Sequence, residues 1–94
     1  MTAVTLLTQA DCALCDHAKT VLARLGRDFT LKVTEIDMAT NPGRRIALAA
    51  GVLFPPGLLL DGEPFGYGRL SERALRKALR HRTDTGDTII NYDV

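Results

Sequence analysis

The chain has 94 residues, which is enough for one domain with its own hydrophobic core and too few for two. Charged residues make up 24% and apolar residues 46%, as in an ordinary soluble globular protein, and no apolar run is long enough to cross a bilayer. The formal net charge is only +1, whereas a nucleic-acid-binding protein needs a clustered basic surface. We therefore expect a single globular domain with neither a nucleic-acid nor a membrane partner.

The two ends of the chain differ from its body. The N-terminus lacks the basic stretch and long apolar core of a signal peptide, so we expect a cytoplasmic protein. In that compartment a cysteine pair is more often catalytic or metal-binding than a structural staple. All 12 Lys and Arg residues lie at or before Arg82, and three aspartates follow it. We therefore divide the chain into a domain of residues 1–82 and a flexible acidic tail of residues 83–94.

The first elements in chain order are an apolar run and a cysteine motif. Residues 3–8 predict a central strand. The stretch Asp11-Cys12-Ala13-Leu14-Cys15-Asp16 follows, and a helix is predicted over 13–25 with Gly26 as its cap. Cysteines with two residues between them, at a helix start after a strand, are typical of a thiol–disulfide site. Residues three apart share a helix face, so the sulfurs can meet, and helix N-terminal amides stabilise a thiolate.

Helical periodicity distinguishes the two cysteines. Cys15 falls in register with the apolar positions of the predicted helix, whereas Cys12 aligns with the polar Asp16 and Lys19. We therefore predict that Cys12 is the attacking thiol and that Cys15 is the buried resolving thiol. The same pair would also be compatible with a structural disulfide, half of a metal site, or two unreactive thiols.

The remaining elements follow the order strand, helix, hairpin and helix. Residues 29–37 alternate as a strand does, which implies a right-handed parallel crossover from the first strand. Thr40-Asn41-Pro42 marks the start of a helix that ends at Gly51. The Asp61-Gly62 turn signal predicts a β-hairpin between residues 58–60 and 65–67. Ser71 caps a third predicted helix, whose pattern fails from residue 81 onward, and residues 89–92 either add an edge strand or trail in solvent.

The order β-α-β-α-β-β-α, with the cysteines at the first helix, resembles the glutaredoxin and thioredoxin superfamily, and most of all its small glutaredoxin-like proteins. The resemblance covers roughly residues 3–81. It rests on Cys12-Ala13-Leu14-Cys15, on Phe54-Pro55-Pro56, on Asp61-Gly62 and on the glycines before the last helix. It implies an α/β thioredoxin-like fold with a four-stranded mixed sheet and three helices.

The resemblance also implies an activity. A glutaredoxin-like protein is a thiol–disulfide oxidoreductase that serves in electron transport and reduces protein or mixed disulfides. Cys12 and Cys15 are then the catalytic residues, and glutathione or another low-molecular-weight thiol is the electron donor. We expect a monomer without a bound cofactor or metal, whose partner is a disulfide-containing protein or a small-thiol mixed disulfide.

A substrate groove is the second expectation that the resemblance carries. In the family, a proline at the position of Pro56 follows a cis peptide bond and packs beside the cysteine pair, so we expect a cis Pro55–Pro56 bond there. Gly66 and Gly68 would line the same groove, and Arg69 at its rim would attract an anionic thiol.

Three features depart from the family pattern. Pro55 has no backbone N–H to offer a substrate. Asp11 places a negative charge beside Cys12, which opposes thiolate formation. The first predicted strand has no charged residue to serve as the buried proton acceptor found in thioredoxins.

Two other classes of function remain open at this stage. One is an iron–sulfur cluster that bridges two subunits with a small thiol completing its ligands, and the other is a non-catalytic binding module. A zinc site within one chain is a poor fit, because Cys12 and Cys15 supply two of the four usual ligands and the only imidazoles are His17 and the distant His81.

Overall fold

The computed structural model describes the backbone of residues 1–92 and the side chains of residues 1–82. The elements are β1 (Thr2–Thr8), α1 (Ala13–Leu25), β2 (Leu31–Asp37), α2 (Asn41–Ala50), β3 (Gly57–Leu60), β4 (Glu63–Tyr67) and α3 (Glu72–Tyr92). The strands form one mixed sheet in the order β2-β1-β3-β4. β1 runs parallel to β2 and antiparallel to β3, which pairs with β4 as a hairpin. This is the predicted thioredoxin-like fold.

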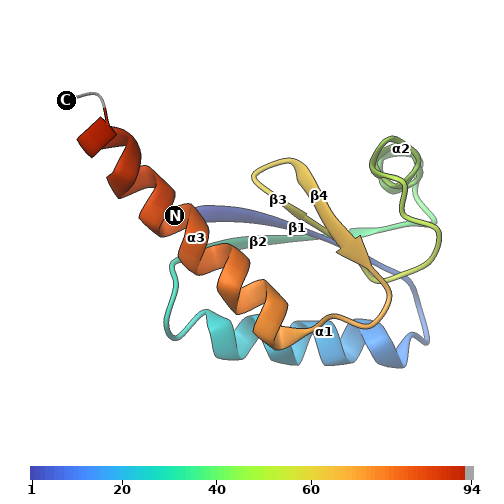
Figure 1. Ribbon diagram of the computed structural model, residues 1–94. Coiled ribbons are helices and arrows are strands. Elements are labelled where there is room, and N and C mark those ends of the chain that lie inside the picture. Colours follow the sequence, from blue (N-terminus) through green and yellow to red (C-terminus); the bar gives the residue numbers. More distant parts are fainter. Residues whose placement is uncertain (93–94) are drawn as a thin grey trace.

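The helices cover both faces of the sheet. α1 and α3 lie on one face and α2 lies on the other (Figure 1). The strand side chains divide accordingly, because successive residues of a strand point to opposite faces. Val4, Leu6, Leu58 and Leu60 pack in the core beneath α1 and α3. Leu7 and Leu59 pack toward α2 instead. None of the helices in the described part of the chain is both long and apolar enough to traverse a lipid bilayer.

The helix boundaries follow local capping rules. The side chain of Thr40 caps α2 by accepting a hydrogen bond from the Gly43 N–H (3.2 Å), and the helix ends at Gly51, which has a φ of +73°. β2 starts two residues later than predicted. The Phe29 N–H donates to the Leu25 carbonyl (2.9 Å), so Phe29 belongs to the turn that closes α1.

α3 is longer than the sequence pattern indicates. It starts as predicted, since the Ala74 N–H donates to the Ser71 hydroxyl oxygen (3.1 Å), but it continues to Tyr92. The expectation that the helical pattern fails at residue 81 is therefore wrong, and residues 89–92 form no edge strand. Extending an existing helix costs far less than nucleating one, so polar residues can continue it. Flexibility of the acidic tail 83–94 stays a prediction.

Candidate active site

The two cysteines form a disulfide at the N-terminus of α1. Cys12 is the N-cap residue and Cys15 lies in the first helical turn, with their Cα atoms 5.2 Å apart. That separation is within the usual range for bridged cysteines. The Cys15 N–H points at the Cys12 sulfur, 3.1 Å away. Because the free amides of a helix N-terminus carry partial positive charge, this arrangement favours a thiolate at Cys12 once the disulfide is reduced.

The two cysteines differ in burial. Cys15 is 2% exposed and lies on the buried side of α1, as its place in the apolar periodicity predicts. Cys12 is only half-buried. A substrate can therefore approach Cys12 more readily than Cys15.

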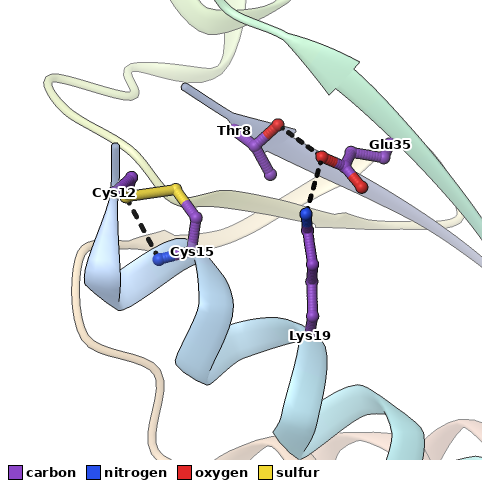
Figure 2. The surroundings of a disulfide bond; sticks show 5 residues. All are labelled: Thr8, Cys12, Cys15, Lys19 and Glu35. Carbon is purple, nitrogen blue, oxygen red and sulfur yellow. Dashed lines mark hydrogen bonds and ion pairs between the residues drawn. A yellow bond between two sulfur atoms is a disulfide. The ribbon is translucent and has the colours of Figure 1, made fainter. Parts of the chain in front are cut away.

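A cluster of polar side chains lies beside the disulfide (Figure 2). The Thr8 hydroxyl, at the buried end of β1, donates to Oε2 of Glu35 on β2 (2.9 Å). The Lys19 ammonium on α1 is 3.1 Å from the same oxygen. The hydrogen bond from Thr8, followed by that from Lys19, holds the pKa of Glu35 below its ordinary value. Glu35 is therefore a carboxylate at neutral pH.

These side chains share one surface depression with the cysteines. It is lined by residues 9–13 and by Thr8, Cys15, Asp16, Lys19, Glu35 and Asp37. Neither Thr8 nor Glu35 was identified as a site residue from the sequence. A signal was present, because Glu35 and Asp37 continue the alternating positions of Leu31 and Val33 and so share their face of β2.

The predicted proline turn lies at the same end of the sheet. The Pro55–Pro56 bond is cis, as expected. Gly57 pairs with Leu7, so Pro56 comes level with Thr8, where β1 leads into the cysteine loop. The Pro56 carbonyl accepts a hydrogen bond from the Gly68 N–H (2.8 Å), which joins two of the predicted substrate-binding residues. Contact of Pro56 with the cysteine pair stays a prediction.

The other predicted groove residues are more dispersed. Gly66 lies in β4, opposite Leu58. Arg69 lines a different depression, together with His17, Leu70, Ser71 and Glu72. His17 is half-buried there, and its Nδ1 atom is buried without a hydrogen-bond partner among the described residues. Arg69 therefore lies toward α3, whereas Glu35 and Lys19 lie on the β2 side of the cysteines.

The residues offer little to a metal ion. Within residues 1–82, no three His, Cys, Asp or Glu side chains lie close enough together to hold one. Two thiols held at a helix N-terminus can instead exchange with another disulfide, which needs only one accessible thiolate and a second thiol within reach.

Comparisons with known proteins agree with this geometry. The family described as glutaredoxin-like domain (DUF836) matches residues 3–80. Uncharacterised proteins from Mycobacterium tuberculosis and Mycobacterium bovis are 33% identical over 85 residues, which cover 85% of this chain and 84% of each relative.

Two of the solved structures to which this chain is similar are thioredoxins. A point-mutant thioredoxin from Halobacterium salinarum superposes with a TM-score of 0.67 and 26% identity, over 85% of this chain and 73% of that one. Oxidised mitochondrial thioredoxin 3 from Saccharomyces cerevisiae has a TM-score of 0.63 and 21% identity, over 85% and 77% of the two chains. The second likeness is a likeness of fold alone.

Proposed function

We propose that this protein, which belongs to the glutaredoxin-like domain family, is a thiol–disulfide oxidoreductase that reduces protein disulfides or mixed disulfides. The observation that carries the proposal is the Cys12–Cys15 disulfide at the start of α1, with Cys12 half-buried and Cys15 buried. Such an arrangement supplies a nucleophile and a resolving thiol in one helical turn.

The proposed reaction has two exchange steps. The Cys12 thiolate attacks one sulfur of a substrate disulfide, forming a mixed disulfide and releasing the other sulfur as a thiolate that takes up a proton. The Cys15 thiol then loses its proton and attacks the Cys12 sulfur. This closes the Cys12–Cys15 disulfide, releases the second substrate thiol and transfers two electrons to the substrate. Two molecules of glutathione or another small thiol restore the dithiol and are themselves oxidised to a disulfide.

Substrate binding is assigned to the end of the loop before β3 and to the segment that leads from β4 into α3. We propose that Pro55 and Pro56, with Gly66, Gly68 and Arg69, border the path by which the substrate reaches Cys12. The hydrogen bond between Gly68 and Pro56 supports this assignment for those two residues, because it fixes the loop at the carboxyl end of β1. We further propose that the protein acts as a monomer in the cytoplasm, where small thiols can regenerate a dithiol.

Trapping of the intermediate tests the function. In a Cys15→Ser variant the second step is blocked, so mixed disulfides through Cys12 should accumulate and disappear on addition of dithiothreitol. Cys12→Ser is the matched control and should trap nothing, because the buried Cys15 cannot reach a substrate. Mass spectrometry of the trapped species, beside turnover of bis(2-hydroxyethyl) disulfide by the wild-type protein, provides the readout. Trapping by Cys12→Ser alone would reverse the roles, and an inactive wild-type protein would reject the function.

A further inference from the structure

The depression beside the disulfide carries more negative than positive charge. Four carboxylates line it, from Asp11, Asp16, Glu35 and Asp37, and Lys19 is the only cation among its described lining residues. The ammonium of Lys19 is engaged by Glu35 at 3.1 Å, so these two charges largely cancel. The other three carboxylates have no ion-pair partner among residues 1–82. The depression therefore has an excess of about three negative charges.

Two of these carboxylates flank the cysteine pair in the sequence. Asp11 immediately precedes Cys12 and Asp16 immediately follows Cys15, and both aspartates are exposed. The carboxylates are too dispersed to form a metal site in the described part of the chain. Both cysteines of the disulfide line the same depression, so a substrate that reaches Cys12 comes close to these carboxylates. Any group that flanks the attacked sulfur of a substrate passes through the field of these carboxylates.

We propose that this field makes the enzyme selective for disulfides flanked by positive charge, as in a basic polypeptide segment, over anionic disulfides such as oxidised glutathione. The inference rests on the proposed function and specifies its substrate class. Three net charges acting over one Debye length, about 8 Å at about 0.15 M salt, change the encounter rate by about two- to fourfold per unit of substrate charge. A substrate end with charge +1 should therefore react roughly 4- to 16-fold faster than one with charge −1.

Three small disulfides of similar size provide the probes. Cystamine carries a positive charge at each end, bis(2-hydroxyethyl) disulfide is neutral, and 3,3′-dithiodipropionate carries a negative charge at each end. The reduced full-length protein is mixed with each, and the rate of Cys12–Cys15 disulfide formation is measured. Each rate is divided by the rate of the same probe with dithiothreitol, which removes differences in intrinsic reactivity. The expected order is cationic, then neutral, then anionic, and the spread should collapse at about 1 M NaCl.

Charge-neutralising variants measure how much the two aspartates that flank the cysteines contribute to the selectivity. The double variant Asp11→Asn and Asp16→Asn should reduce the cation-to-anion rate ratio to roughly twofold, since about one of three net charges remains. The ratio is the readout because a change in Cys12 reactivity cancels from it. Asp28→Asn is the control, since Asp28 is exposed, lies after α1 and pairs with Arg76 (2.8 Å) away from the depression. That variant should keep the wild-type ratio.

The outcomes separate the two proposals. A ratio near one, a ratio that salt does not change, or the fastest reaction with the anionic probe would overturn the charge selection while leaving the oxidoreductase function intact. The last of these results would point to docking along Arg69 instead. Failure of all three probes to produce the Cys12–Cys15 disulfide would overturn the oxidoreductase function, and the inference with it.

Discussion

Gly68 is the position where a single added methyl group should affect both stability and reactivity. Its φ is +81°, and a Cβ placed there would be 2.9 Å from Cε1 of Phe54. Its N–H donates to the Pro56 carbonyl, so the loop around it cannot relax freely. The change Gly68→Ala therefore introduces an unfavourable backbone conformation and a steric overlap together.

The two costs can be estimated separately. A non-glycine residue in the left-handed region costs about 1–2 kcal/mol. The Phe54 ring is 51% exposed and can rotate away from the new methyl group, but it then loses its edge-to-face contact with Tyr67, whose ring centroid is 5.0 Å away. Such a contact is worth about 0.5–1.5 kcal/mol. Gly68→Ala should thus lower the free energy of unfolding by roughly 1.5–3.5 kcal/mol.

Gly51 provides the matched control. Its φ is +73°, but no heavy atom lies within 4 Å of the added Cβ, so Gly51→Ala should cost only about 1–2 kcal/mol. Urea unfolding followed by far-UV circular dichroism measures both values. In a Phe54→Ala background the two glycine substitutions should cost the same. Equal costs in the wild-type background, or a difference that survives removal of the ring, would refute the steric account.

The same pair of variants reports on the groove. Displacing the Phe54 ring should disturb the loop that we assign to substrate binding, so Gly68→Ala should slow the reaction with bis(2-hydroxyethyl) disulfide. Gly51 lies at the end of α2 and Gly51→Ala should leave that rate unchanged.

Three further predictions concern the thiols, the chain end and pH. Limited iodoacetamide treatment of the reduced protein should label Cys12 before Cys15 in peptide maps, and the reverse order would exchange their roles. Truncation after Arg82 should leave the melting temperature and redox activity nearly unchanged, because Arg82 itself keeps its ion pairs with the β3–β4 turn. A large fall in the melting temperature would show that the removed residues stabilise the fold. Glu35→Gln should cost no more than about 1 kcal/mol at pH 7. Because the pKa of Glu35 is lowered on folding, its contribution to stability is present above its unfolded pKa of about 4.3 and is lost as the pH falls through the folded value. The free energies of unfolding of the wild-type and Glu35→Gln proteins should therefore converge at acidic pH.

The geometry of the cysteine pair could be predicted because local rules determine it. The apolar spacing along residues 13–25 indicated both ends of α1 and placed Cys15 inward. The turn signal at Asp61-Gly62 similarly indicated the hairpin. The cis bond before Pro56 was different in kind, since only the family resemblance indicated it.

The polar cluster beside the disulfide depends on contacts that no local pattern fixes. The parallel register places Leu6 opposite Glu35, and the α1 crossover then brings Lys19 over the same carboxylate. Sequence separation hides this arrangement, because each residue alone is an ordinary polar position on a strand or helix. The separation of Arg69 from the cysteine depression is likewise a result of how the loop after β4 enters α3.

The acidic surroundings need not prevent thiolate formation at Cys12. The Cys15 N–H contacts the Cys12 sulfur directly at 3.1 Å, and charge stabilisation at a helix N-terminus is worth about 0.3–1 kcal/mol, or up to about 2 in partly buried sites. Asp11 and Asp16 are exposed, so water and salt weaken their opposing effect on the sulfur. The same aspartates line the depression that holds the disulfide, so their field also acts on a substrate that approaches Cys12. At the sulfur the helix terminus and the carboxylates therefore oppose one another with effects of similar size, while the aspartates also act on the charge of the incoming disulfide.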